Sequence, residues 1–372
     1  MAFVRAWMHR DAQRAGVQCD AGKVQQVGHA RAAGVAQKCD LVEIDAESGH
    51  AVMLAQLEGG GEMDMPTAGL QMAPEVTPSG DALGARLTGL DLARELTRDE
   101  LAFVLRAIAT HGVLCFPDQV LDPAAQAAFS RRFGELEVHV SGAFQAPGQP
   151  EVMILANMIE NGQPVGLGDA GQDWHTDMSF SRTIAFVNVL YALQVPRRDG
   201  RALGNTEFCD MAAAYDDLPA ELQARLGTLT ATHDFEKFWE MMRARGGEVT
   251  TRAKLTEAQR QRKPPVSQPM VLTHPLSGRK LLYANPGYTM RIDGMPAAES
   301  DALLEFLFEH QTQQKFRYAH RWAERDVLLW DNIRTIHNAV ADYGADNPRY
   351  IRRCQAMADR VFQPEFAALA GA

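Results

Sequence analysis

Two hydrophobic periodicities, one helical and one strand-like, recur along the chain from residue 84 onward. Residues 97–112, TRDELAFVLRAIATHG, have the helical spacing of apolar residues, at Leu101, Val104, Leu105 and Ile108. Such a stripe covers one face of a helix. Thr97 with Glu100 three residues later is a capping-box pattern, and glycine is the usual residue after a helix end. The segment therefore predicts a helix that begins after Thr97 and ends at Gly112.

Short apolar runs bounded by turn residues predict strands, and longer amphipathic runs predict further helices. The expected strands lie at 113–117, 151–157, 185–195 and 327–332. The expected helices lie at 122–134, 211–229 and 297–313. Because strands outnumber helices and do not alternate with them, the pattern favours an α+β protein that is mainly β over a βαβ wind.

Residues 1–72 differ from the remainder of the chain. They are rich in Ala, Gly and Gln, contain three consecutive glycines at 59–61, and lack long periodic apolar runs. Such a composition is typical of segments that do not build a core. We expect 1–72 to be a poorly ordered extension or the product of a mis-called start, and 73–372 to be the functional domain.

Composition and charge narrow the functional classes. The net charge of −10 is unfavourable for a nucleic-acid binder, although one arginine in a pocket can still bind a small anion. No apolar run approaches the ~18 residues of a membrane helix. The five cysteines are scattered without a CxxC pair, which disfavours a disulfide scaffold and indicates a reducing cytoplasm.

The candidate chemistry begins with QDWHTDMSF at 172–180, where His175 and Asp177 are two residues apart. On a strand, residues i and i+2 share a face, so both side chains could reach one ion. His337, in a later strand-like run, is the best third ligand. Two histidines and one carboxylate suit Fe(II) oxygenases, but zinc hydrolases also use mixed histidine and carboxylate ligands.

Arg349 and Arg353 follow His337 and are four residues apart, so they can share a face. A guanidinium group is shaped to bind a carboxylate, although arginines near a C-terminus are often simply solvated. The adjacent Arg352 could line the site in place of Arg349 or Arg353. Thr206 could donate its hydroxyl to a carboxylate or be an ordinary turn residue. His139 lies in a run expected to be a strand, where a hydrogen-bonded structural histidine is the ordinary interpretation.

Several motifs occur together in one order along the chain: QDWHTDMSF, LGNTEFCDMAAAYDDLP, FRYAHRW, LLWDNIRTIHNAVADY and RYIRR. In this order they resemble the taurine dioxygenase and 2,4-dichlorophenoxyacetate dioxygenase family of Fe(II)- and 2-oxoglutarate-dependent oxygenases. The resemblance extends from about residue 75 to about residue 362. Where the family often reads WDNR, this chain reads WDNI, and Arg334 follows one place later.

The resemblance implies a double-stranded β-helix, or jelly roll, with helices packed outside. It also implies that His175, Asp177 and His337 bind Fe(II), with 2-oxoglutarate as cosubstrate and O₂ as oxidant. Members of the family are often homo-oligomers, so a homo-oligomer is expected here.

The resemblance further assigns roles to the second group of residues. Arg349, helped by Thr206, would bind the distal carboxylate of 2-oxoglutarate. Arg353 would face the acidic group of the substrate, with His139 nearby. Independently of the resemblance, the segment 233–247 is expected to belong to a mobile lid over the site. Its Phe235, Phe238 and Trp239 are expected to form either an apolar wall of the site or a packed helix face.

Three hypotheses follow. The first is a dioxygenase that hydroxylates a small organic anion, such as an aryloxyalkanoate or a sulfonate, with succinate and CO₂ as co-products. The second is a zinc-dependent hydrolase on a similar barrel. The third is a non-catalytic barrel that binds an organic acid. The paired arginines favour the first hypothesis over the second, because a hydrolase does not need to hold a keto acid.

Overall fold

The computed structural model describes residues 73–139, 143–246 and 253–371, together with six short strands between residues 18 and 54. The chain divides into two units, Met1–Leu70 and Gln71–Ala372. In the first unit the short strands pair antiparallel as β1 (Gln18–Asp20) with β2 (Lys23–Gln25), β3 (Ala30–Ala32) with β4 (Val35–Gln37), and β5 (Asp40–Ile44) with β6 (Ala51–Leu54). The role assigned to residues 1–72 stays a prediction.

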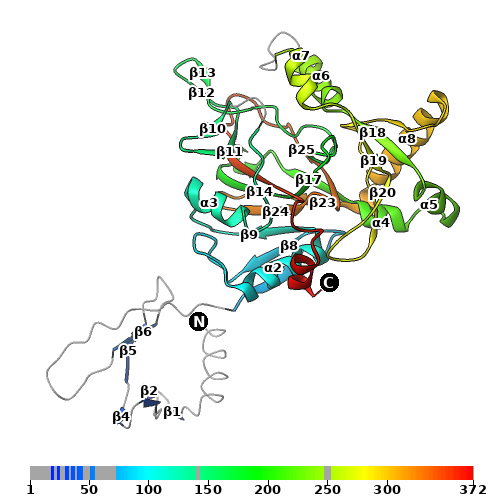
Figure 1. Cartoon of the computed structure of the whole chain (residues 1–372). Coiled ribbons are helices and arrows are strands. Elements are labelled where there is room, and N and C mark those ends of the chain that lie inside the picture. Colours follow the sequence, from blue (N-terminus) through cyan, green and yellow to red (C-terminus); the bar gives the residue numbers. More distant parts are fainter. Residues whose placement is uncertain are drawn as a thin grey trace. The chain divides into compact units, whose positions relative to one another are not determined.

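The second unit is built around an eight-stranded sheet (Figure 1). Its order is β10 (Gln145–Ala146), β11 (Gln149–Ala156), β26 (Tyr350–Met357), β14 (Ala185–Gln194), β24 (Val327–Asp331), β9 (Val113–Phe116), β8 (Ala85–Thr88) and β7 (Glu75–Pro78). The first eight residues of β14 are all buried, as expected of a central strand covered on both faces. The predicted strands at 113–117, 151–157, 185–195 and 327–332 are confirmed within one or two residues.

A three-stranded sheet carries two of the candidate site residues. Its order is β23 (Arg317–His320), β17 (Thr206–Asp210) and β25 (Thr335–Ala339). Thr206 begins β17, and His337 is the central residue of β25.

A second three-stranded sheet consists of β19 (Val266–Pro269), β18 (Thr230–His233) and β22 (Thr289–Ile292). Three two-stranded sheets complete the described strands of this unit: β12 (Ile159–Glu160) with β13 (Gln163–Pro164), β15 (Arg197–Arg198) with β16 (Arg201–Ala202), and β20 (Val271–Thr273) with β21 (Lys280–Leu282).

Helix α2 (Arg98–His111) confirms the first helical prediction. Thr97 and Glu100 form the capping box, and Gly112 adopts a left-handed conformation with φ 68° at the C-cap. Helix α3 (Pro123–Ser130) is capped by Asp122, but it ends four residues before the predicted boundary at 134. Helix α3 packs on β11 and β26, and α2 packs on β9 and β24.

The predicted helix at 211–229 is wrong as a single element. The structure has two short helices there, α4 (Met211–Asp216) and α5 (Ala220–Leu226). Pro219 separates them because proline has no N–H to donate and disfavours helical geometry in the residue before it. The helix predicted at 297–313 is α8 (Ala297–Gln311). The other helices of the described ranges are α6 (Phe235–Gly246), α7 (Glu257–Arg262), α9 (Pro364–Ala367) and the 3₁₀ turns η2 (Gln314–Phe316) and η3 (Ala368–Ala370).

Arg334 joins three distant segments by a buried ion pair. Its Nη2 and Nε lie 2.6 and 3.1 Å from the two carboxylate oxygens of Asp210, the N-cap of α4. Its Nη1 donates to the carbonyls of Ala109 and Thr110 at the end of α2, at 2.8 and 3.0 Å. The arginine displaced by one position from the WDNR pattern therefore anchors the turn between β24 and β25, the strand that carries His337.

Removal of this guanidinium should destabilise the fold. Arg334→Ala leaves the buried carboxylate of Asp210 with only its N-cap amides and the more distant Arg279, whose Nη1 lies 3.9 Å away. We therefore expect the free energy of unfolding to fall by roughly 3 kcal/mol. Urea denaturation measures this loss. Arg325→Ala, which removes a half-exposed pair with Asp118, is the control and should cost about 1 kcal/mol or less. Equal losses in the two variants would contradict a structural role for Arg334.

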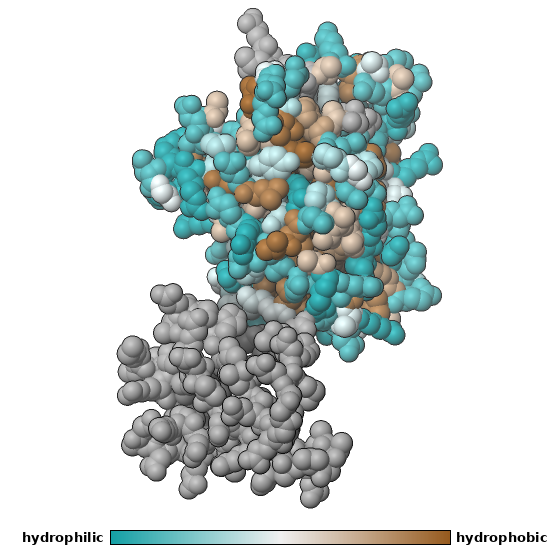
Figure 2. Space-filling view, turned by 90° about the vertical axis from the view of Figure 1, so that its left-hand side faces the viewer, coloured by the Kyte–Doolittle hydropathy of each residue, from teal (hydrophilic) through white to brown (hydrophobic). Residues whose placement is uncertain are grey.

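The second unit is thus mainly sheet, with helices packed on the outside (Figure 1). On the face drawn in Figure 2, hydrophilic side chains surround scattered hydrophobic ones. Within the described ranges, none of the helices combines the length and the apolar character that crossing a bilayer requires.

Candidate metal centre and the adjoining cavity

The HxD motif, expected on a strand or at a strand end, lies at a single bridge and the turn that follows it. His175 makes a single antiparallel bridge to His337, with N–H···O distances of 3.0 and 2.7 Å. A turn follows, in which Met178 has a φ of 59°. Asn332 holds this turn, because its Oδ1 accepts from the Asp177 amide at 3.1 Å and its Nδ2 donates to the Asp177 carbonyl at 2.8 Å. A bridge plus a turn, rather than strand alternation, brings the histidine and the aspartate together.

His175, Asp177 and His337 form a buried cluster whose potential ligand atoms all lie within 4.8 Å of one another. His175 Nε2 lies 3.6 Å from Asp177 Oδ1, and His337 Nε2 lies 3.8 Å from Asp177 Oδ2. These separations are too long for hydrogen bonds, but they leave room for an ion between the three groups. Two imidazoles and one carboxylate on one side of an ion are the donor set of non-haem Fe(II) oxygenases.

Hydrogen bonding and electrostatics around the three side chains favour metal binding. His175 Nδ1 lies 2.7 Å from the Asp173 carbonyl and must donate to it, which leaves the Nε2 lone pair for a metal. Burial, together with His175, holds the pKa of His337 well below its usual value, so this imidazole is neutral. Burial acts to raise the pKa of Asp177, but Arg353 and the two histidines outweigh it and keep the pKa below the usual range.

Gly287 leaves the space in which His175 stands. A Cβ atom at this position would lie 2.7 Å from the Cβ of His175 and 3.0 Å from the ring of Phe238. Gly287→Ala should therefore displace His175 and weaken metal binding by about 10–100-fold, the range seen when the support of a ligand is lost. Isothermal titration with Fe(II) or Mn(II) measures this. Gly344→Ala, where a Cβ would meet nothing within 4 Å, should leave the affinity unchanged; equal affinities in the two variants would contradict the steric argument.

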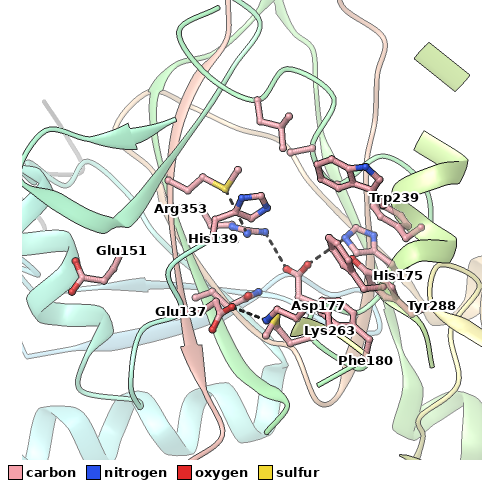
Figure 3. A pocket seen from close by; sticks show the side chains of 18 of the residues that line it. Glu137, His139, Glu151, His175, Asp177, Phe180, Trp239, Lys263, Tyr288 and Arg353 are labelled. Atoms are coloured by element: carbon pink, nitrogen blue, oxygen red, sulfur yellow. Dashed lines mark hydrogen bonds and ion pairs between the residues drawn. The ribbon is translucent and has the colours of Figure 1, made fainter. Parts of the chain in front are cut away.

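A cavity of about 870 Å³, counting the space open to solvent, adjoins the cluster (Figure 3). His139, His175, Asp177 and Arg353 are among its walls. Arg353 projects from β26 and its Nη1 lies 3.3 Å from Asp177 Oδ2. One side of the cavity is aromatic, lined by Phe180, Phe235, Phe238, Trp239 and Tyr288. The three aromatic residues expected from 233–247 are therefore in the wall, on α6, whereas the motion expected of a lid stays a prediction.

Arg349 and Thr206 do not line this cavity, and both are buried, with 5% and 3% of their surface exposed. The guanidinium of Arg349 lies over the ring of Tyr343, 5.7 Å from its centroid, and within the described residues its Nε has no hydrogen-bond partner. Thr206 Oγ1 accepts a hydrogen bond from Trp322 Nε1 at 3.1 Å. A buried donor without a partner suits an anionic ligand.

Arg352 points away from the cluster. Its Nη2 donates to the Leu121 carbonyl, and its guanidinium lies 5.0 Å from the ring centroid of Tyr191. Successive side chains of a strand face opposite sides, so Arg353 and Arg352 on β26 cannot both face the cavity. His139 lies in an irregular segment rather than in the predicted strand.

The family model "Taurine catabolism dioxygenase TauD, TfdA family" matches residues 75–355. The chain belongs to this family. A 2-oxoglutarate-dependent dioxygenase of Cupriavidus pinatubonensis, named for 2,4-dichlorophenoxyacetate, is 35% identical over 301 residues, which are 78% of this chain and 100% of that protein. A sulfate ester dioxygenase of Pseudomonas putida is 30% identical and covers 78% of this chain and 93% of its own length. The crystal structure of AAD-2 with Mn(II) and N-oxalylglycine has a TM-score of 0.63 and 30% identity, over 77% of this chain and 98% of AAD-2.

As a member of the TauD/TfdA family, the chain is a 2-oxoglutarate-dependent dioxygenase, and its cofactor and cosubstrates are Fe(II), 2-oxoglutarate and O₂. This finding favours the first of the three sequence hypotheses over the zinc hydrolase and the non-catalytic barrel.

The sequence reasoning missed several residues around this TauD/TfdA site. Asn332 orients the ligand turn, and Gly287 leaves space for His175. Lys263 and Glu137 form an ion pair of 3.1 Å at the cavity wall. The WDN motif could have pointed to Asn332, because it directly precedes the turn into β25. No local signal marks the other three, since their roles depend on contacts between segments far apart in the chain.

Proposed function

We propose that this dioxygenase binds Fe(II) through His175, Asp177 and His337 and hydroxylates a small organic anion. The observation that carries this proposal is the buried set of two imidazoles and one carboxylate beside a cavity. The bound iron supplies O₂ activation coupled to the decarboxylation of 2-oxoglutarate to succinate and CO₂. The protein holds the three ligands in place, orients the substrate and keeps water from the reacting centre.

Arg349 and Thr206 are the proposed partners of the distal carboxylate of 2-oxoglutarate. A cationic group with an unpaired, buried Nε is costly unless an anion completes it, which supports this role for Arg349. Tyr343 lies under the Arg349 guanidinium and against Gly204, two residues before Thr206. The ring of Tyr343 therefore contacts Arg349 and lies beside the segment that leads into Thr206.

The substrate is a small anion with an apolar body, such as an aryloxyalkanoate, a sulfonate or a sulfate ester. Arg353 and His139 line the cavity and supply polar groups for the acidic end of the substrate. The aromatic side, which includes Phe238 and Trp239, suits the apolar end. The names of the two relatives, one acting on an aryloxyacetate and the other on sulfate esters, support this class.

We further infer that the eight-stranded sheet and the sheet β23-β17-β25 are the two halves of a double-stranded β-helix. Support comes from the likeness to solved dioxygenases of the family and from the bridge between His175 and His337. A cytoplasmic location is supported by three buried free thiols, Cys115, Cys209 and Cys354. A homo-oligomer is part of the same proposal, and light scattering of the purified chain tests it.

Oxygen-dependent succinate formation tests the proposed function. The purified chain with Fe(II), ascorbate and 2-oxoglutarate should form succinate when one member of a panel of aryloxyacetates, aryloxypropionates, alkylsulfonates and alkyl sulfates is added. Succinate and hydroxylated or cleaved product should appear in a 1:1 ratio and only in air. Product formation without O₂ would instead support a hydrolase, and binding without any turnover would support a non-catalytic barrel.

A further inference from the structure

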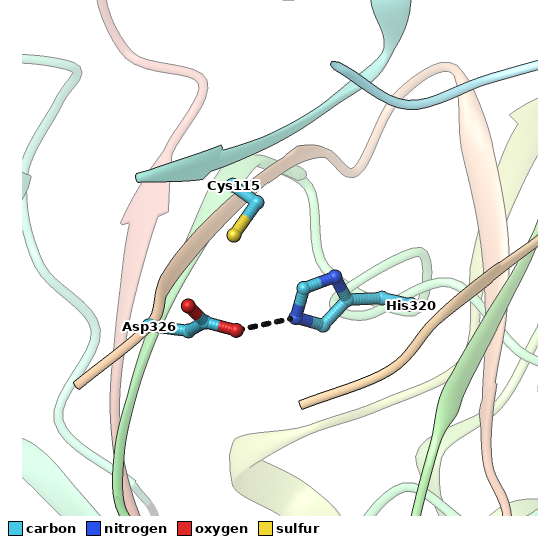
Figure 4. A group of neighbouring side chains, drawn as sticks. All are labelled: Cys115, His320 and Asp326. Atoms are coloured by element: carbon cyan, nitrogen blue, oxygen red, sulfur yellow. Dashed lines mark ion pairs between the residues drawn. The ribbon is translucent and has the colours of Figure 1, made fainter. Parts of the chain in front are cut away.

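A second cluster of metal-ligating side chains lies outside the iron site. Cys115 on β9, His320 at the end of β23 and Asp326 in the turn before β24 converge in the interior (Figure 4). Their potential ligand atoms all lie within 4.8 Å of one another, and the three residues are 8%, 4% and 5% exposed. We propose that these residues form a second metal site, which binds a zinc-like divalent cation and stabilises the fold.

The spacing of the cluster matches a tetrahedral ion better than a hydrogen bond. His320 Nε2 lies 3.4 Å from Asp326 Oδ2, and this buried nitrogen has no hydrogen-bond partner among the described residues. Nitrogen and oxygen ligands that each lie about 2.0–2.1 Å from a tetrahedral zinc ion are about 3.3–3.4 Å apart. The distance between His320 Nε2 and Asp326 Oδ2 therefore already equals the distance between two ligand atoms of a tetrahedral zinc ion.

Neighbouring groups fix the orientation of both side chains. His320 Nδ1 lies 3.3 Å from the Tyr318 hydroxyl, and the ring stands edge-on to Trp322 with centroids 4.7 Å apart. With Nδ1 donating to the Tyr318 oxygen, Nε2 presents its lone pair to Asp326 and Cys115. Asp326 Oδ2 is held by the Ala323 amide at 2.9 Å. Partners of this kind orient ligands in protein metal sites.

The charge and the donor types also favour such a cation. A thiolate, a carboxylate and a neutral imidazole balance the charge of a divalent ion, which is important where the protein excludes water. Sulfur and imidazole donors select zinc-like ions over Mg²⁺ or Ca²⁺. Without metal, burial and the neighbouring Asp326 raise the pKa of the Cys115 thiol. Coordination would release the thiol proton, and a single buried water molecule would complete the shell of the ion.

The proposed ion would lie next to the pair of strands β23 and β17, and β17 carries Thr206. His320 is the cross-strand partner of Thr206 between β23 and β17, and Trp322 Nε1 donates to Thr206 Oγ1. Cys115 belongs to the large sheet, where it is the partner of Leu328. An ion bound by these three residues would tie the edge strand β23 to the large sheet and so hold Thr206 in place.

Cobalt(II) is the probe for this site, because a thiolate ligand gives an intense near-ultraviolet charge-transfer band and the iron site has no sulfur. The full chain is freed of metal and titrated anaerobically with Co(II). We expect two equivalents per chain and the thiolate band in the wild type. His175→Ala should lose one equivalent and keep the band. Cys115→Ala should lose the band and the other equivalent.

Cys354→Ala, which removes another buried thiol, is the matched control and should keep the band. If Cys115→Ala does not fold, Asp326→Asn preserves the volume and should weaken Co(II) binding at this site by more than 10-fold. The proposal is overturned if the wild type shows no thiolate band, or if the band persists in Cys115→Ala. It is also overturned if His175→Ala binds no metal, because the cluster is then only a hydrogen-bonded network.

Discussion

Exchange of His175 for alanine should abolish stoichiometric iron binding and reduce turnover to background. The change removes one of three ligands and leaves Asp177 beside Arg353 without the imidazole that faces it at 3.6 Å. Loss of a group that merely supports a ligand costs about 10–100-fold in metal affinity, so loss of a ligand should cost more than about 100-fold. Titration with Fe(II) under argon and succinate formation in air measure the two effects.

His310→Gln is the control for this variant. His310 is also a buried histidine, but its Nε2 lies 2.9 Å from the Ala214 carbonyl, and a glutamine amide can replace that contact. The control should bind iron and turn over like the wild type. Turnover by His175→Ala at the wild-type rate would show that the three residues are not the iron ligands, however well their geometry suits an ion.

Exchange of Arg349 for alanine should sharply raise the concentration of 2-oxoglutarate that the enzyme requires. A charge-assisted hydrogen bond contributes about 1.5–3 kcal/mol, which corresponds to roughly a 10–150-fold increase in KM. The kcat should change far less, because Arg349 is expected to bind the carboxylate remote from the reacting carbon. Steady-state kinetics with 2-oxoglutarate as the varied substrate give both constants.

Arg352→Ala is the matched control, because it removes a neighbouring guanidinium that faces the opposite side of β26 and bonds to the Leu121 carbonyl. This variant should keep the wild-type KM for 2-oxoglutarate, with a cost in stability alone. A raised KM in Arg352→Ala together with an unchanged KM in Arg349→Ala would reverse the two assignments.

Much of the fold could be predicted because its signals are local. The boundaries of α2 follow from a capping box and a glycine in the left-handed region, which involve residues within one turn. The long central strands follow from apolar runs such as 185–195, which become β14. The signal for the break between α4 and α5 is also local, because it is Pro219 itself. The sequence prediction missed this break because the apolar residues on both sides of Pro219 have helical spacing.

The sequence identified the candidate ligands His175, Asp177 and His337, but it did not show how the chain brings them together. His175 and Asp177 meet through a bridge to His337 and a turn held by Asn332, which is 155 residues away from Asp177 in the chain. Neither contact is encoded near the motif. The register of the arginines was likewise ambiguous in the sequence, and only the strand geometry of β26 separates Arg352 from Arg353.

The measurement that tests the central claim most directly is a visible spectrum of the metal-free chain after anaerobic addition of Fe(II) and 2-oxoglutarate. An iron held by His175, Asp177 and His337 and chelated by the keto acid should give a weak charge-transfer band in the middle of the visible range, which is lost when air is admitted. His175→Ala should stay colourless. A colourless wild-type solution, or a band of equal strength in His175→Ala, would contradict the assignment of this iron site.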